Sequence, residues 1–265
     1  CIARSLDEQG SFEPPAVANN FIEWYNSDPF DIGGLTAATL RRLASDGDWQ
    51  QIGVEEWRHL PEGSNAGNGS LMRCAPYGIA FYSAMDDLVA ASRVSSAITH
   101  ADPRCQWSCV VLNATIAGLL NGVDRPLENA LAVADNAPEE VQDAATATAN
   151  IVSGDGANDT MDLKNSGYVV TTLQAGLYHG LTAETAEDAI IDAVMMGGDT
   201  DTIAAVAGGI AGARFGAAAL PDRWLDEIAE TDELRQLGNS LYEQTFDVAE
   251  DAEAMLTDGR LDLQI

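Results

Sequence analysis

The chain has 265 residues, of which 46% are hydrophobic, and its 42 acidic and 13 basic residues give a formal charge of −29. This apolar content excludes a wholly disordered chain, and the length allows one domain with a large core, which we expect to span residues 1–265. No basic footprint is present, so we expect no nucleic-acid partner. The acidic residues are spread along the chain rather than gathered in one tail, which indicates a surface adapted to concentrated salt and hence a halophilic source.

The four cysteines form neither a paired C-x-x-C pattern nor a disulfide-dense spacing. We therefore expect reduced, mostly buried thiols in a cytoplasmic protein. The longest weakly polar run, Ile203 to Leu220, is interrupted by Arg214 and rich in glycine. No membrane-spanning segment is predicted from it.

Helical periodicity dominates, with proline near several predicted helix starts and glycine after several ends. The predicted helices are Cys1–Gln9, Pro15–Asn26, Leu35–Ser45, Met85–Thr99, Pro103–Asn121, Pro126–Asn136, Pro138–Val152, Val169–Tyr178, Thr182–Met196, Thr202–Phe215, Pro221–Thr231 and Asp232–Asp247. The single candidate strand is Arg260–Ile265. The expected fold is all-α, a compact orthogonal globule of many helices. We expect the Ala/Gly-rich helix that begins at Thr202 at its centre, because small residues let neighbouring helices approach closely.

Two loops in the N-terminal half carry candidate functional residues. Asp31 lies in the run Pro29–Thr36 just before a predicted helix, where capping is the default role of a carboxylate. The glycines of the loop Ser64–Arg73 allow positive φ angles and expose successive N–H groups, so this loop can cradle a phosphate, although a plain turn is the commoner outcome. It is neither a Walker loop nor a dinucleotide fingerprint, because no Gly-Lys-Ser/Thr follows and no strand precedes it.

Two further candidates lie where predicted helices meet loops. His100 stands between one helix end and the next helix start, where its side chain either satisfies the last carbonyls of a helix or faces a ligand pocket as a phosphate or hydroxyl partner. Tyr168 follows Gly167 at a helix start, where the ring either stacks on a base or covers the core.

The densest polar cluster is Gly197-Gly198-Asp199-Thr200-Asp201-Thr202. The glycines should stop the preceding helix, so the cluster is predicted to be a turn between two helices. In a turn the two carboxylates can converge, and Thr202 adds an oxygen; oxygens without sulfur or imidazole suit Mg²⁺ or Mn²⁺. The alternative is that these residues only cap the next helix.

Together these loops resemble the ADP-ribosylglycohydrolase family, all-α enzymes that remove ADP-ribose from modified side chains. The matching runs stand in the family's order and are Pro29–Gly33, Gly67–Arg73 with Ala75–Pro76, Thr99–His100, Gly167–Val169 and Gly198–Thr202 with the Ala/Gly helix after it. They span about residues 1–220, and the last run is the most specific.

The resemblance implies a hydrolase that acts on an ADP-ribosylated protein or small molecule through a centre of two Mg²⁺ or Mn²⁺ ions. It implies that Asp31 lies close to the metals and steers a proton. The implied metal ligands are Asp199, Asp201 and Thr202. The implied substrate-binding residues are Gly67, Asn68, Gly69 and Ser70 for the pyrophosphate, His100 beside them, and Gly167 and Tyr168 for the nucleotide or ribose.

In the family, a Thr-Asp-Asp run that supplies further ligands precedes the helix that Cys1–Leu6 resembles, and the printed sequence does not contain it. We expect the natural chain to begin upstream of Cys1. A non-catalytic member of the fold that binds ADP-ribose or metal is the alternative, and a different metal-dependent hydrolase is a more distant one. We expect a monomer.

Overall fold

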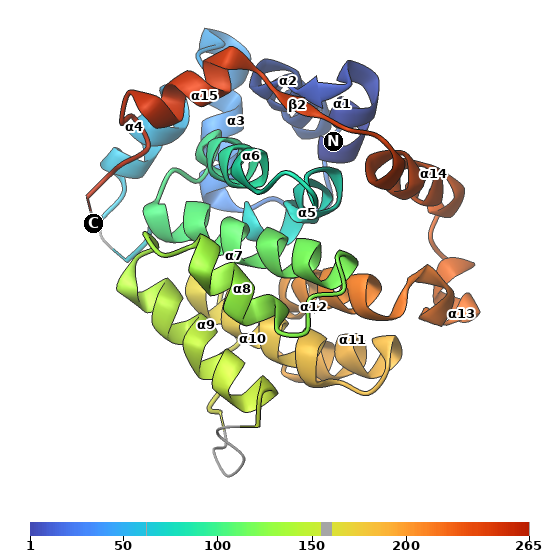
Figure 1. The fold of residues 1–265 in the computed structure, drawn as a ribbon. Coiled ribbons are helices and arrows are strands. Elements are labelled where there is room, and N and C mark those ends of the chain that lie inside the picture. Colours follow the sequence, from blue (N-terminus) through green and yellow to red (C-terminus); the bar gives the residue numbers. More distant parts are fainter. Residues whose placement is uncertain (62, 155–160, 265) are drawn as a thin grey trace.

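The computed structural model describes residues 1–61, 63–154 and 161–264, and helices account for nearly all of its regular structure (Figure 1). The predicted all-α class is confirmed. Most helices lie within a few residues of their predicted positions: α1 (Ile2–Gln9), α2 (Pro14–Asn26), α3 (Gly34–Asp46), α6 (Met85–Ala97), α7 (Pro103–Leu120), α8 (Pro126–Val133), α9 (Glu139–Val152), α10 (Val169–Thr182), α11 (Ala186–Met195), α12 (Thr200–Phe215) and α14 (Thr231–Glu243).

Several short elements were not predicted. They are α4 (Ile52–His59), η1 (Leu71–Arg73), α5 (Ala75–Ala80), η2 (Ala217–Ala219) and α15 (Glu250–Thr257). The helix predicted over Pro221–Thr231 is wrong beyond one turn, α13 (Asp222–Leu225). The helix predicted from Thr182 begins later, because Thr185 caps α11 by accepting a hydrogen bond from the Asp188 N–H at 3.0 Å.

The strand prediction at the C-terminus is wrong for residues 260–264, and Ile265 lies outside the described residues. The two strands are β1 (Ser11–Phe12) and β2 (Asp247–Val248), which pair in parallel with Ser11 opposite Asp247. The C-terminal segment instead lies against α6, where Arg93 donates to the carbonyl of the buried Leu261 at 3.4 Å. A side chain, rather than a neighbouring strand, thus donates to the Leu261 carbonyl.

The central helix is α7 (Figure 1), in which every residue from Pro103 to Gly118 is buried. Several of its buried polar side chains, among them Arg104, Gln106 and Asn113, hydrogen-bond to other protein groups. The prediction that α12 lies at the centre is wrong, because α12 buries one face while Ala205 on another is exposed. Within the described part of the chain, no helix has the length and apolar character needed to cross a membrane.

Helices α10 and α12 pack at very short range. A Cβ on Gly176 would lie 2.3 Å from Val206 Cγ1, and one on Gly180 would lie 2.6 Å from Ile210 Cβ. The small residues that allow this approach are thus on α10, whereas α12 contributes branched side chains. Contacting positions rise together along both helices, so the two run parallel and their N-terminal ends lie side by side. This arrangement places the segments before α10 and α12 next to each other.

Candidate active site

Three loops that are distant in sequence are joined by backbone hydrogen bonds. The Asn68 N–H donates to the Gly167 carbonyl at 3.1 Å, and the Val169 N–H donates to the Ala66 carbonyl at 3.0 Å. The Asp199 N–H donates to the Asn165 carbonyl at 3.3 Å. The segment before α10 therefore connects the glycine loop, defined as residues 65–70, to the acidic loop, defined as residues 197–202.

The side chain of Asn68 reinforces this connection. It is buried, and its amide nitrogen donates to Asp199 Oδ2 at 2.7 Å and to Thr172 Oγ1 at 2.9 Å. Asp199 occupies the N-cap position of α12, yet its side chain makes no capping hydrogen bond. Of the two interpretations of Asp199, the geometry therefore favours a carboxylate directed at the glycine loop over one that only caps a helix.

The acidic loop depends on glycine. Gly197 and Gly198 have φ angles of 74° and 65°, so they end α11 in the left-handed conformation as predicted. A Cβ on Gly198 would lie 2.3 Å from the Asn165 carbonyl oxygen. Only glycine allows the acidic loop to approach the neighbouring backbone this closely.

The oxygen atoms available to a metal form a partial set. Thr202 is buried, and among the described residues its hydroxyl has the sulfur of Met72 as its single partner, at 3.8 Å. Asp201, two residues after Asp199, is exposed. Among the described residues no group of three or more His, Cys, Asp or Glu side chains is placed to hold a metal. Two carboxylates and a hydroxyl fit one Mg²⁺ that keeps several water ligands, and they do not by themselves make a two-ion centre.

His100 packs under the glycine loop rather than capping a helix with its ring. The side chain is 3% exposed, and burial lowers the pKa of His100 to about 3, with the charge of Arg73 acting in the same direction. Thr99 Oγ1 accepts from Arg73 Nη2 at 2.6 Å and lies 2.7 Å from His100 Nδ1. The Thr99 hydroxyl accepts from Arg73 and can either donate to Nδ1 or accept from Nδ1–H, so this contact fits both neutral tautomers of the ring.

The imidazole fills the space beneath Gly69. A Cβ at Gly69 would lie 2.9 Å from His100 Cε1, 3.0 Å from His100 Nε2 and 3.3 Å from Thr36 Oγ1. The start of α3 is thus close to the glycine loop, and Asp31 lies three residues before α3 begins. Asp31 is exposed, and the role assigned to it stays a prediction.

The glycine loop offers backbone rather than side-chain donors. The hydroxyl of Ser70 is buried and accepts from Ser96 Oγ at 2.8 Å, and the amide nitrogen of Asn68 is used as described above. The Asn68 N–H is also committed to a backbone bond. The N–H groups of Gly69 and Ser70 have no acceptor within the described residues; Gly69 is partly exposed and Ser70 is buried, so the Gly69 N–H is the donor that an anion can reach directly.

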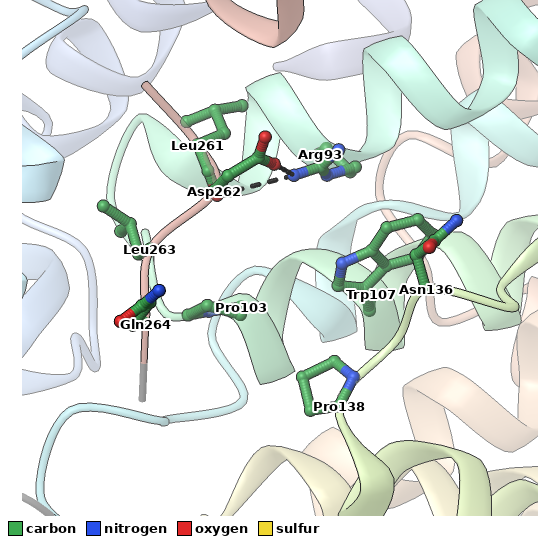
Figure 2. Close-up of a pocket in the computed structure, with 9 residues that line it drawn as sticks. All are labelled: Arg93, Pro103, Trp107, Asn136, Pro138, Leu261, Asp262, Leu263 and Gln264. Atoms are coloured by element: carbon green, nitrogen blue, oxygen red, sulfur yellow. Dashed lines mark hydrogen bonds and ion pairs between the residues drawn. The ribbon is translucent and has the colours of Figure 1, made fainter. Parts of the chain in front are cut away.

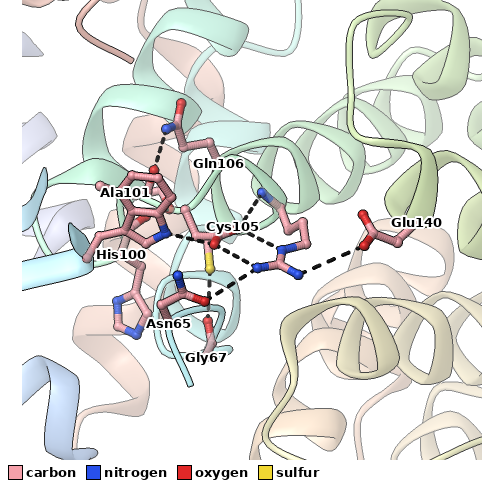
Figure 3. Close-up of polar contacts among 11 residues, drawn as sticks. Asn65, Gly67, His100, Ala101, Cys105, Gln106 and Glu140 are labelled. Carbon is pink, nitrogen blue, oxygen red and sulfur yellow. Dashed lines mark hydrogen bonds and ion pairs between the residues drawn. The ribbon is translucent and has the colours of Figure 1, made fainter. Parts of the chain in front are cut away.

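Sequence reasoning missed the polar cluster behind Tyr168. Arg104 pairs with the fully buried Asp102, and Arg104 Cζ lies 5.8 Å from the centre of the Tyr168 ring. Figure 3 shows the contacts in this region, including that of Cys105 with the Gly67 carbonyl at 3.2 Å. An Asp before Pro at a helix start predicts a cap, which Asp102 provides, but nothing in the sequence indicated a buried arginine.

Four helix N-termini meet around the glycine loop, namely those of α3, α7, α10 and α12. Their contacts are those of Thr36, Cys105, Val169 and Asp199 given above. Helix N-termini present free N–H groups and partial positive charge, which suits a phosphate-bearing ligand. A cavity of about 810 Å³ lies elsewhere, between Trp107, Arg93 and the C-terminal segment, and none of the predicted site residues lines it (Figure 2).

Comparisons with known proteins agree with this geometry. The ADP-ribosylglycohydrolase family model matches residues 1–250. A protein of Pseudomonas putida named "ADP-ribosylarginine hydrolase Tri1" is 31% identical over 258 residues, covering 94% of this chain and 66% of the relative. The "ADP-ribosyl-[dinitrogen reductase] glycohydrolase" of Rhodospirillum rubrum is 27% identical over 227 residues, covering 86% of this chain and 70% of the relative.

A solved structure titled "ADP-ribosylglycohydrolase-related protein complex" superposes with a TM-score of 0.71 at 28% identity, covering 91% of this chain and 77% of the other. The chain spans just under two thirds of the length of two relatives, the protein of Pseudomonas putida and its namesake in Serratia proteamaculans. The helical fold, the joined loops and these similarities lead to one conclusion: the chain belongs to the ADP-ribosylglycohydrolase family.

Proposed function

We propose that this protein hydrolyses the bond between ADP-ribose and a modified side chain or small molecule. The observation that carries the proposal is the hydrogen bond from Asn68 to Asp199, 2.7 Å long, which ties the glycine loop to the acidic loop. It joins the glycine loop, to which we assign anion binding, to the acidic loop, to which we assign the metal ligands. A ligand with a pyrophosphate at one end and a reactive ribose carbon at the other requires that combination.

In this proposal the pyrophosphate binds the N–H groups of Gly69 and Ser70, where the N-termini of α3, α7, α10 and α12 meet. The His100 ring lies beside them, with Nε2 3.0 Å from the position of a Cβ on Gly69. Tyr168, half-buried at the start of α10, offers a ring face to the nucleotide or ribose. Binding energy gathered here is remote from the bond that breaks and positions that bond.

The chemical part rests on the acidic loop. Asp199, Asp201 and Thr202 would hold Mg²⁺ or Mn²⁺, and the bound cation would orient the ribose hydroxyls and lower the pKa of a water. Asp31 is the proposed group that moves a proton, since cleavage of a glycosidic bond passes through an oxocarbenium-like state. A second ion would need ligands in addition to these residues.

The leaving group is proposed to be an arginine guanidinium. The relative in Pseudomonas putida, which is 31% identical, is named as an ADP-ribosylarginine hydrolase, and this name supports the choice. The net charge of −29 favours the approach of a cationic target. The four cysteines are free, with Cys74, Cys105 and Cys109 buried, which fits a reducing cytoplasm. A monomer working in concentrated salt completes the proposal.

The test is release of ADP-ribose from an ADP-ribosylated arginine substrate, with and without Mg²⁺ or Mn²⁺. Wild-type protein should release ADP-ribose only with the cation, and Asp199→Ala and Asp201→Ala should each abolish release. Asp192→Ala is the control, because Asp192 is exposed on α11 outside the acidic loop. Unchanged turnover in the two loop variants would refute the ligand assignment. Binding of ADP-ribose without any turnover would favour the non-catalytic alternative.

A further inference from the structure

Arg104 is a buried cation that the proposed reaction does not use. Its side chain is 8% exposed, and the fully buried carboxylate of Asp102 accepts from its Nε and Nη2, both at 2.9 Å. Trp57 Nε1 donates to the same carboxylate at 2.8 Å. The Asp102 carboxylate is thus held from α4 as well as α7, so the guanidinium has little freedom to turn.

The fixed guanidinium reaches towards the candidate site. Its Nη2 lies 3.4 Å from Asn65 Oδ1, in the glycine loop, and its Nη1 lies 3.9 Å from Glu140 on α9 (Figure 3). Its Cζ lies 5.8 Å from the centre of the Tyr168 ring. Arg104 is therefore a single group that touches the glycine loop, α9 and the start of α10.

The side chain of Tyr168 is less constrained than its main chain. Tyr168 follows the exposed residues Ser166 and Gly167, and the backbone bridge to Gly67 fixes its main chain but not its ring. The guanidinium of Arg104 lies over the face of this ring. Burial raises the pKa of Tyr168, and the positive charge of Arg104 opposes that change.

We propose that Arg104, locked by Asp102, is a positioning residue that holds the side chain of Tyr168 in the orientation needed for ADP-ribose. The inference rests on the proposed function, because it takes Tyr168 as part of the ADP-ribose site. The planar guanidinium can bond the Asp102 carboxylate along its edge while its face lies against the aromatic ring. Lysine keeps the charge, but its single ammonium group cannot reproduce that geometry.

The experiment is a double-mutant cycle of Arg104→Lys and Tyr168→Leu, read out as the Kd for ADP-ribose by calorimetry. Arg104→Lys should weaken binding about tenfold when residue 168 is Tyr, and by less than about twofold when it is Leu. Tyr168→Leu alone should also weaken binding several-fold, because the aromatic face is lost. A residue that only supported the fold would weaken binding equally in both backgrounds.

The matched control is Arg93→Lys, which changes another arginine stacked on an aromatic ring, 4.8 Å from the centre of Trp107, at the cavity of Figure 2. This variant should leave the Kd unchanged. If Arg104→Lys does not fold, Tyr168→Leu keeps the proposal testable, since it leaves the buried ion pair intact; a wild-type Kd in that variant would overturn the proposal. Additive effects in the cycle would overturn it too. A wild-type protein that binds no ADP-ribose would instead overturn the proposed function, and the role of Tyr168 with it.

Discussion

Replacing His100 with Gln should change how stability depends on pH. Burial lowers the pKa of His100 to about 3 in the folded protein, whereas an unfolded chain has a histidine pKa of about 6.5. Below pH 6.5 the unfolded chain therefore takes up a proton that the folded protein does not. The stability that the neutral ring contributes is fully present above pH 6.5 and is lost progressively as the pH falls towards 3.

The magnitude follows from the pKa difference. Between pH 7 and pH 5 the unfolded state gains about 2 kcal/mol from protonation of this histidine, while the folded state gains almost nothing. The His100→Gln variant lacks this effect. The difference in unfolding free energy between wild type and variant should therefore shrink by about 2 kcal/mol over that interval. Taking the difference removes most of the contribution of the acidic residues, which both proteins share.

The assay is urea unfolding followed by circular dichroism at pH 5, 6 and 7, in concentrated salt that screens the acidic surface. His59→Gln is the control, because His59 is exposed at the end of α4, and its difference from wild type should change much less. Unfolding free energies of wild type and His100→Gln that change in parallel with pH would contradict the lowered pKa of His100. They would mean that the imidazole is charged, or solvated, in the folded protein.

Two glycine positions, each compared with a control glycine, give further predictions. Gly69→Ala should abolish ADP-ribose binding at a cost of about 1–3 kcal/mol in stability, because its Cβ would lie 2.9 Å from the imidazole ring beneath it. Gly212→Ala, which meets nothing within 4 Å in α12, should bind normally and gain about 1 kcal/mol. Gly198→Ala should cost several kcal/mol, since a positive φ and a 2.3 Å contact with a carbonyl oxygen coincide there. Gly47→Ala has the same kind of φ but open space around it, and should cost only about 1 kcal/mol. Chemical unfolding measures all four, and equal losses for Gly198→Ala and Gly47→Ala would contradict the close contact with Asn165.

Local sequence signals predicted the long helices, because each carries its own start and stop chemistry. Thr185 and Gly197 mark the ends of α11 without reference to the rest of the fold. The short α5 and the strand pair β1–β2 carry no such signal, since they are fixed by contacts between distant segments. The central position of α7 was missed because small residues in α12 were taken as a sign of burial. Helix α7 carries polar residues such as Asn113, and its burial depends on a hydrogen bond to the distant Ser92 that the local sequence does not reveal.

The candidate site was predictable as separate loops but not as an arrangement. The glycines near Asn68 and the aspartates near Thr200 indicated anion and cation chemistry, and their family order suggested that they meet. The hydrogen bond between Asn68 and Asp199 depends on parallel packing of α10 and α12, which follows from Gly176 and Gly180 fitting against α12. No local pattern shows such a fit. The buried pair behind Tyr168 was missed for the same reason.

We expect ADP-ribose to bind where the glycine loop, the segment before α10 and the acidic loop meet. An amide NMR titration of the protein with ADP-ribose tests this location without requiring turnover. The largest shifts should occur at the N–H groups of Gly69 and Ser70, with smaller shifts at Gly167 and Tyr168. Shifts confined to the cavity near Trp107, with those of Gly69 and Ser70 unchanged, would contradict this location.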